Sequence, residues 1–317
     1  MSRSPSRAAA WSGLLPVDKP AGPTSHDVVA RARRMFGTRA IGHLGTLDPG
    51  ATGLLVLAVG AATRCASVWQ GGRKTYEGVA RFGLVTDTQD VDGRVLERRG
   101  GSPAEADVRA AAERLTGDVM QTPPMVSALK LGGERLYAIA RRGETVDRVP
   151  RPVRVESWDW LAFAEGEARF RVICSGGTYV RTLVHDLGAA LGCGAALANL
   201  RRLASEPFTV ERGCAWEALD ESLCAETIAS HGILLDRALD TLPAVVLDAT
   251  GVDALGHGQP AAVDRAPGGA SGPRSVVLRD GDGRALALGE VREAPGGGAF
   301  AHPQVVFPWA VREGRAA

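Results

Sequence analysis

The chain carries, at residues 42–53, the stretch Gly42-His43-Leu44-Gly45-Thr46-Leu47-Asp48-Pro49-Gly50-Ala51-Thr52-Gly53. It places one carboxylate, Asp48, in a loop punctuated by glycines and a proline, and the apolar run 54–59 follows directly. A short apolar run bounded by turn residues predicts a buried strand. A carboxylate at the mouth of such a strand has the rigid support that a catalytic group requires. Taken alone, an Asp-Pro pair more often just begins a turn.

Length and composition are those of a globular protein. The chain has 317 residues, enough for one large domain and a smaller one, with 45% hydrophobic and 23% charged residues. No apolar run approaches the roughly 20 residues that a membrane span needs. Residues 1–12 lack the long apolar core of a signal peptide, and we expect them to form a disordered lead-in.

The cysteine pattern argues against two kinds of site. There are five cysteines, an odd number, and none belongs to a CxxC pair. Such spacing argues against a disulfide framework and against a zinc site. We therefore expect no metal and a cytoplasmic location. The cysteines are Cys65, Cys174, Cys193, Cys214 and Cys224.

Charge is unevenly distributed along the chain, although the net charge is only +1. Residues 1–150 hold 21 basic and 15 acidic side chains, whereas residues 151–317 hold 16 and 21. A basic N-terminal half suits a polyanionic ligand, though an imbalance this small permits others. Lysine is scarce, and the three present, Lys19, Lys74 and Lys130, are worth attention because lysine and arginine differ chemically.

The dodecamer at residues 42–53 resembles the catalytic loop of the TruB family of tRNA pseudouridine synthases. The matching pattern is G-H-x-G-T-L-D-P-x-A-T-G, with Leu44 and Gly50 at its variable places. The resemblance implies that Asp48 is the catalytic aspartate. It also implies that His43 fills the gap left by a flipped-out base or stacks beside that base. In isolation, His43 would more often be a structural loop residue.

Three further motifs are similar to the same family. In D-K-P-x-G-x-T-S, at residues 18–25, the family's lysine supports the catalytic loop, and Lys19 is also a candidate for substrate binding. In the motif from Lys74 to Gly93, Tyr76 matches the tyrosine that stacks on the target base and takes part in proton handling. The alternative for Tyr76 is an ordinary half-buried strand aromatic.

The third motif, S-x-G-T-Y-[IV]-R-x-L, begins at Ser175. Here Arg181 matches the arginine that pairs with the catalytic aspartate, and Tyr179 is a candidate substrate contact. Leu200, further along, is expected to wall the uracil pocket. Alternatively, Arg181 is a surface residue near a helix start, where the helix dipole does not favour a cation.

The resemblance implies an α+β fold: a mixed, largely antiparallel-sheet pseudouridine synthase catalytic domain (13–242) with an inserted RNA-gripping lobe (about 122–152). A small C-terminal β domain (243–317), PUA-like in position, is expected to fold apart from the chemistry. The positive charges of Lys130 and several arginines support an RNA-binding role of the lobe modestly. The alternative is that the lobe is an ordinary surface loop. The lobe's arginines are Arg135, Arg141, Arg142 and Arg148.

Residue patterns also predict individual elements. Helices are expected at 26–36 with Ser25 as N-cap, at 61–69 and at 104–115. Strands are expected in the following ranges: 153–163, 168–174, 275–279, 285–291 and 304–307. On the first helix, the exposed face carries arginines that either contact phosphate or are simply solvated. These are Arg31, Arg33 and Arg34.

The predicted function is isomerisation of uridine to pseudouridine at position 55 in the T-arm loop of tRNA, by base flipping and an essential aspartate. This reaction needs no redox change or group donor, so no cofactor is expected. The expected partner is tRNA. We expect the protein to act as a monomer, to need no guide RNA and not to bind a membrane. One alternative is a non-catalytic RNA-binding or tRNA-folding protein on the same scaffold. Another is an aspartate-dependent phosphatase, since Thr46-Leu47-Asp48 faintly resembles the D-x-D-G-T-L motif in the wrong order.

Overall fold

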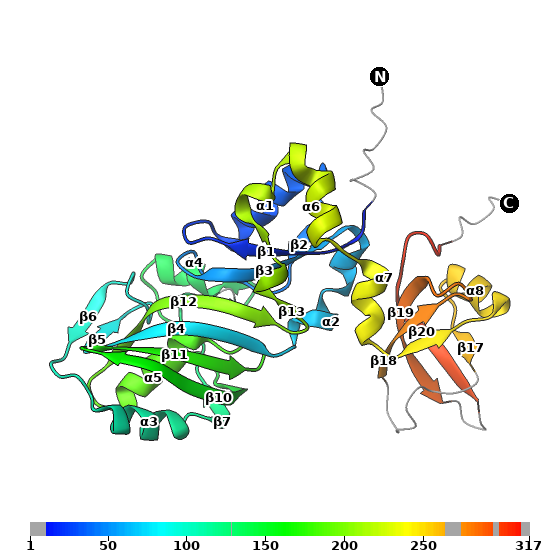
Figure 1. Cartoon of the computed structure of the whole chain (residues 1–317). Coiled ribbons are helices and arrows are strands. Elements are labelled where there is room, and N and C mark those ends of the chain that lie inside the picture. Colours follow the sequence, from blue (N-terminus) through cyan, green and yellow to red (C-terminus); the bar gives the residue numbers. More distant parts are fainter. Residues whose placement is uncertain (1–10, 128, 264–273, 294–297, 312–317) are drawn as a thin grey trace.

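The computed structural model describes residues 11–127, 129–263, 274–293 and 298–311. In these ranges the chain forms a large sheet with helices on its two sides and, beside it, a smaller β unit at the C-terminal end (Figure 1). Most of the predicted lead-in, residues 1–10, lies outside the described residues. Among the described residues, no helix is both long and apolar enough to cross a membrane.

The large sheet has eleven strands in the described part of the chain, and its main path runs β14-β1-β3-β12-β4-β11-β10-β7. Neighbouring strands are antiparallel except for β1 with β14 and β3 with β12. This arrangement confirms the mixed, largely antiparallel sheet of the predicted α+β fold. The strands are β1 (Gly13–Lys19), β2 (Ile41–His43), β3 (Thr52–Val59), β4 (Lys74–Phe82), β7 (Gly117–Gln121), β10 (Arg151–Ala164), β11 (Glu167–Cys174), β12 (Ala195–Ser205), β13 (Phe208–Thr209), β14 (Cys214–Ala215) and β15 (Ile233–Leu234).

The centre of the sheet combines one expected strand with one that was not expected. The apolar run after Asp48 forms β3 and is almost wholly buried. No strand is predicted at residues 195–205, which are rich in alanine and leucine, yet they form β12 between β3 and β4. Pairing on both edges overrides the weak strand propensity of alanine.

Helices pack on both sides of this sheet. Helices α3 and α5 lie together on one side, beneath β10 and β11, whereas α1 and α6 lie beyond β1 at the other end (Figure 1). The core between them includes Phe36, Phe170 and Leu187, all fully buried. The helices are α1 (Ser25–Phe36), α2 (Ser67–Gln70), α3 (Glu105–Glu113), α4 (Leu136–Arg141), α5 (Val180–Ala190), α6 (Cys224–His231) and α7 (Leu235–Ala238). Five 3-10 turns accompany them: η1 (Gly60–Cys65), η2 (Val210–Arg212), η3 (Trp216–Ala218), η4 (Glu221–Leu223) and η5 (Leu239–Thr241).

Two of the expected helices differ in detail. The N-cap of α1 is Thr24 and not Ser25, because Thr24 and Asp27 form a reciprocal capping box. Ser25 is instead the first helical residue, and its hydroxyl is buried. The helix expected at 61–69 is a 3-10 turn, η1, followed by the single α turn of α2.

The structure also contains small two-stranded sheets. One joins β5 (Leu84–Thr86) to β6 (Val95–Arg98). The other joins β8 (Lys130–Leu131) to β9 (Glu134–Arg135), and α4 follows it directly. This hairpin and helix occupy the segment interpreted as an inserted lobe.

Over its described residues, the C-terminal unit contains a five-stranded sheet in the order β16-β18-β19-β20-β17 and one helix. Its own core includes Leu255, Val276 and Ala301. The sequence patterns identify β18, β19 and the end of β20 but miss the rest. The elements are β16 (Ala244–Val246), α8 (Ala249–Gly256), β17 (Ala261–Val263), β18 (Arg274–Arg279), β19 (Ala285–Glu293) and β20 (Ala299–Val306).

That this unit folds apart from the chemistry stays a prediction, although it is joined to the first part of the chain by a second apolar cluster. We call it the junction cluster. It combines side chains of the large sheet and α7 with side chains of the C-terminal unit. Asp236, at the start of α7, also accepts a hydrogen bond from the backbone N–H of Ala285 at 2.6 Å. Members from the first part include Leu14, Leu54, Trp69, Leu235 and Leu239, and those from the C-terminal unit are Val277, Ala285, Leu288 and Phe307.

Candidate active site

Asp48 lies in the loop between β2 and β3, two antiparallel neighbours in the sheet. Its side chain is half-buried and lines two adjoining cavities, of about 970 Å³ and 270 Å³. We call these the large and the small cavity. Among the described residues that line the small cavity, Asp48 is the only carboxylate.

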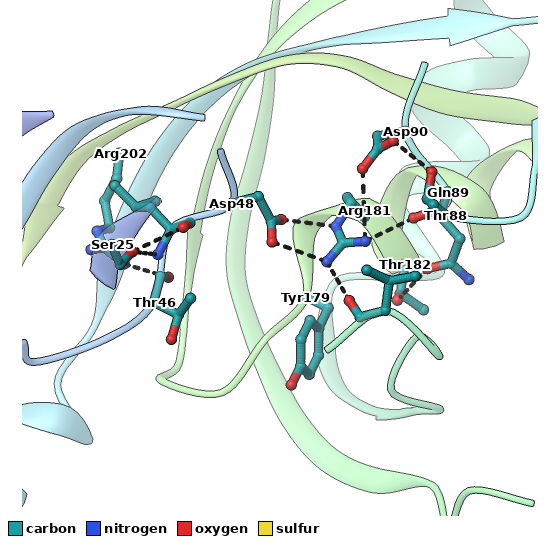
Figure 2. A network of polar contacts seen from close by, with 12 residues as sticks. Ser25, Thr46, Asp48, Thr88, Gln89, Asp90, Tyr179, Arg181, Thr182 and Arg202 are labelled. Carbon is teal, nitrogen blue, oxygen red and sulfur yellow. Dashed lines mark hydrogen bonds and ion pairs between the residues drawn. The ribbon is translucent and has the colours of Figure 1, made fainter. Parts of the chain in front are cut away.

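Arg181, in the first turn of α5, faces Asp48 across the site (Figure 2). Its Nε lies 2.9 Å from Oδ2 of Asp48, and its Nη2 lies 3.3 Å from Oδ1. The guanidinium therefore engages both carboxylate oxygens, as the resemblance implies. The Arg181 side chain is only 5% exposed, so the guanidinium half of the ion pair is shielded from water.

The remaining donors of Arg181 connect the pair to two other loops. Nη1 donates to the carbonyl of Thr88 and Nη2 to that of Val126, each at 2.8 Å. Asp90 approaches Nη1 at 3.7 Å, and burial raises the pKa of its carboxyl, opposed by a hydrogen bond from Thr88. Asp90 was not singled out from the sequence, although it belongs to the motif that begins at Lys74.

Aromatic and apolar side chains complete the small cavity. Tyr76 from β4, Leu200 from β12 and Tyr179 from the start of α5 all line it beside Asp48. Burial raises the pKa of the Tyr76 phenol, so its hydroxyl stays protonated. The backbone N–H and carbonyl of Tyr179 are both bound by the amide of Gln121, which fixes the entrance to α5.

The structure thus brings together Asp48, Tyr76, Arg181, Tyr179 and Leu200, which come from sequence positions far apart. His43 lies at the other side of Asp48, in the wall of the large cavity. The side chain of Lys130 lies outside the described residues, so its predicted role stays a prediction.

Lys19 is not placed to contact a substrate, which corrects its interpretation as a binding residue. Its side chain is fully buried, and its ammonium donates to the carbonyls of Pro20, Pro23 and Pro49 at 2.7–3.1 Å. Pro49 follows Asp48 directly, so Lys19 supports the backbone of the catalytic loop. Burial lowers the pKa of Lys19 to about 8, and the carboxylate of Asp48 opposes part of that shift.

Two of the three arginines on α1 have structural positions. Arg31 donates to the carbonyl of Leu219 and stacks over Trp216, while Arg33 donates to the carbonyl of Ile41. Phosphate contact is therefore a poorer interpretation for these two side chains than tertiary packing. Arg34 remains on the exposed face.

The described arginines of the lobe are also engaged within the protein. Arg142 forms ion pairs with Glu134 and Glu144, and Arg148 donates to the carbonyl of Pro123. The lobe nevertheless borders the site, because Tyr137 and Glu144 line the large cavity. Its nearness to Asp48 supports an RNA contact better than its charge does.

Sequence patterns miss two residues that hold the catalytic loop. Ser25 exchanges hydrogen bonds with the backbone of Leu47, and Arg202 donates to the carbonyls of Gly45 and Thr46 (Figure 2). The sequence around Arg201 and Arg202 does not indicate which of the two arginines is buried. Within the described residues, no three His, Cys, Asp or Glu side chains are grouped as metal ligands would be.

Comparison with protein families gives two adjoining matches. Residues 33–180 match the model described as TruB family pseudouridylate synthase (N terminal domain). Residues 181–246 match the tRNA pseudouridylate synthase B C-terminal domain. Together they cover the large sheet from α1 onward and every side chain placed around Asp48 except Lys19 and Ser25.

Curated relatives carry one name. A tRNA pseudouridine synthase B of Burkholderia mallei is 42% identical over 90% of this chain and 94% of its own length. The protein of the same name from Opitutus terrae is 49% identical over 66% of this chain and 87% of its own. That from Mycobacteroides abscessus is 42% identical over 87% of this chain and 91% of its own.

Solved structures show the same fold at lower identity. A Cbf5-Nop10-Gar1 complex contains a chain that is 25% identical, with a TM-score of 0.72 over 98% of this chain and 90% of that one. A chain of an H/ACA RNP bound to a substrate RNA containing 2'-deoxyuridine is 24% identical, with a TM-score of 0.69 over 93% of this chain and 84% of that one.

Proposed function

The chain belongs to the TruB family of tRNA pseudouridine synthases, and we propose that Asp48 is the group with which it acts on a uridine at position 55, in the T-arm loop. Its activity is the isomerisation of uridine to pseudouridine in tRNA. The observation that carries the role of Asp48 is its place in the wall of the small cavity, held by both oxygens to a buried arginine.

The chemistry requires a group that acts on the nucleoside itself. The bond between N1 of uracil and C1′ of ribose breaks, the base rotates, and C5 bonds to C1′; C5 then loses its proton, and N1 ends with one. An ionised carboxylate can attack the nucleoside or remove a proton from its sugar, and we assign one of these roles to Asp48. Arg181 compensates the charge of Asp48 and holds its two oxygens in one orientation.

The shape of the site fits an extruded base. A uridine stacked in RNA must be flipped out, at a cost of roughly a few kcal/mol. Tyr76 and Leu200 offer the apolar walls between which a planar base can stack, and both lie beside Asp48. The phenol of Tyr76 is protonated and can donate a hydrogen bond to the base. To His43, which lines the large cavity, we assign the filling of the space that the base leaves or stacking beside the base.

The partner is tRNA, without guide RNA, and the protein acts as a monomer. The higher identity to proteins named tRNA pseudouridine synthase B than to the Cbf5 chains supports the guide-free form. We assign the lobe and the C-terminal unit to RNA contacts outside the small cavity. A tRNA substrate also supports a cytoplasmic location. Family membership removes the phosphatase alternative.

The test is to incubate purified protein with a T-arm stem-loop and to map pseudouridine in the product. We expect one pseudouridine, at position 55. A stem-loop with cytidine at that position is the control and gains none. A wild-type preparation that is folded and binds the stem-loop but forms no pseudouridine contradicts the proposal and favours the non-catalytic RNA-binding alternative.

A further inference from the structure

Arg202 occupies an unusual place for an arginine. Its side chain is 2% exposed, and all three of its guanidinium nitrogens donate to backbone carbonyls rather than to a carboxylate. Nε donates to Leu54 at 2.7 Å, Nη2 to Gly45 at 3.1 Å and Nη1 to Thr46 at 3.4 Å. Burying a charge with such partners is costly, which suggests a functional reason for keeping it.

The three carbonyls belong to the two sides of the catalytic loop. Gly45 and Thr46 precede Asp48, whereas Leu54 lies in the buried part of β3 after it. Arg202 therefore fastens the start of the loop to the strand that follows it. The parallel pairing of β12 with β3 makes this reach possible and requires Gly53, since a Cβ there would lie 2.2 Å from the carbonyl oxygen of Arg202.

On its other edge, Arg202 is the cross-strand neighbour of Tyr76. The two residues pair directly between β12 and β4, and both line the small cavity. Because they are direct cross-strand neighbours, the two side chains lie on the same face of the sheet. A guanidinium can only donate, so in a hydrogen bond between these two side chains the phenol oxygen is the acceptor and its own proton is left to point elsewhere.

We propose that Arg202 is a positioning residue that sets two parts of the site at once: the backbone that carries Asp48, and the hydroxyl of Tyr76, whose proton it leaves free to donate into the small cavity. The inference rests on the proposed role of Asp48. It extends that role to a residue that acts through the catalytic loop and through Tyr76. The Arg202 side chain thereby fixes the position of the Asp48 carboxylate relative to the Tyr76 phenol.

Arg201 provides a matched control on the same strand. It pairs with Asp18 through two hydrogen bonds of 2.7 and 3.0 Å, on a half-exposed surface away from the cavities. The same substitution can thus be made at adjacent residues with opposite environments. Surface ion pairs of this kind contribute little to stability.

The experiment compares Arg202→Lys with Arg201→Lys in single-turnover pseudouridine formation, together with RNA affinity and thermal unfolding. For Arg202→Lys we expect at least about a 30-fold lower rate, RNA affinity within about threefold, and for Arg201→Lys a rate within about twofold of wild type. An Arg202→Lys rate near that of wild type overturns the inference. A wild-type protein that makes no pseudouridine contradicts the proposed function instead.

A double-mutant cycle separates positioning of Tyr76 from general loop support. In a Tyr76→Phe background, the loss caused by Arg202→Lys should shrink by about threefold or more, because the hydroxyl that it positions is gone. Arg201→Lys should have the same small effect in both backgrounds. Full additivity for Arg202→Lys refutes the Tyr76 part of the proposal.

If Arg202→Lys does not fold, nitrogen NMR of the arginine guanidinium groups tests the same contact in folded protein. The wild type should give resolved, slowly rotating Nη signals for Arg202, and Tyr76→Phe should shift them. Arg201 signals should stay unchanged. Identical Arg202 signals in the wild type and in Tyr76→Phe contradict the proposal.

Discussion

The catalytic loop, residues 42–53, and the C-terminal unit are held to the rest of the chain in different ways. Around the loop, Lys19, Ser25 and Arg202 direct individual hydrogen bonds at named backbone atoms. At the junction with the C-terminal unit, an apolar cluster of many side chains dominates the contact. Directed bonds demand one residue type at one place, whereas apolar packing demands mainly volume. We therefore expect substitutions at the loop to affect chemistry and those at the junction to affect stability.

Asp48→Asn should have the largest effect. The amide has the same shape but is neither a nucleophile nor a base, so we expect the single-turnover rate to fall by about a thousandfold or more. RNA affinity should stay within a few-fold. Asp159→Asn, at an exposed position on β10, is the matched control and should leave the rate unchanged. Residual activity of Asp48→Asn above about a thousandth of wild type would remove Asp48 from the central role.

Arg181→Lys should follow, with a rate about 100-fold lower, which corresponds to about 2.7 kcal/mol of transition-state stabilisation. A single ammonium cannot engage both oxygens of Asp48 and also reach the carbonyls of Thr88 and Val126. Arg154→Lys, which changes only an exposed pair with Asp118, is the control. Normal turnover by Arg181→Lys would mean that the observed pair does not set the geometry of Asp48.

Alkaline pH should loosen the loop through Lys19, whose pKa burial lowers to about 8. A neutral amine has two N–H donors for three carbonyls, so one bond is lost and the rate should fall by about fivefold above pH 8. The contribution of Lys19 to the free energy of unfolding should change in the opposite direction to the rate as the pH rises. Between about pH 8 and 10.5 the folded state binds fewer protons at Lys19 than the unfolded state, so this lysine's contribution to the free energy of unfolding rises with pH.

The measurement is a pH series of single-turnover rates. Lys19→Arg should lose the alkaline decrease because a guanidinium does not titrate in this range. Lys74, whose pKa burial also lowers to about 8, bonds the carbonyls of Gln70 and Gly72 instead, so Lys74→Arg should keep the decrease. An unchanged alkaline decrease in Lys19→Arg would assign it to another group.

Leu288→Ala should have the smallest effect on the rate. Leu288 belongs to the junction cluster, and removing its side chain leaves a cavity that typically costs about 2–5 kcal/mol of stability. The unfolding temperature should drop by several degrees while the rate at 25 °C stays within about twofold. Leu96→Ala, at an exposed position on β6, should change neither quantity.

The same contrast explains what the sequence could reveal. The motifs around Asp48, Tyr76 and Arg181 are long because directed contacts fix residue identity, and the structure brings these side chains together. The motif that contains Lys19 implied support of the catalytic loop, which its buried contacts match, but the motif did not exclude substrate binding as well. Nor does a pattern reveal that Arg202 is buried and Arg201 is not, since that depends on which face β12 turns to the site.

The rest of the fold depended on contacts between distant segments. Residues 195–205 look helical in composition and become a strand only because β3 and β4 lie on either side. The junction cluster gathers apolar residues from Leu14 to Phe307, and any apolar residue of suitable size would serve there. Such a contact leaves no local pattern, which is why the sequence did not reveal how the C-terminal unit packs on the rest of the chain.

The most direct test of this division is to measure two quantities on the same preparations of Arg181→Lys and Leu288→Ala: the single-turnover rate of pseudouridine formation on the T-arm stem-loop at 25 °C, and the unfolding temperature. We expect opposite profiles for the two variants. Arg181→Lys should be about 100-fold slow with an unfolding temperature close to that of the wild type, and Leu288→Ala should unfold several degrees lower with a nearly normal rate. Rates that fall in both variants in proportion to the loss of unfolding temperature would contradict that expectation.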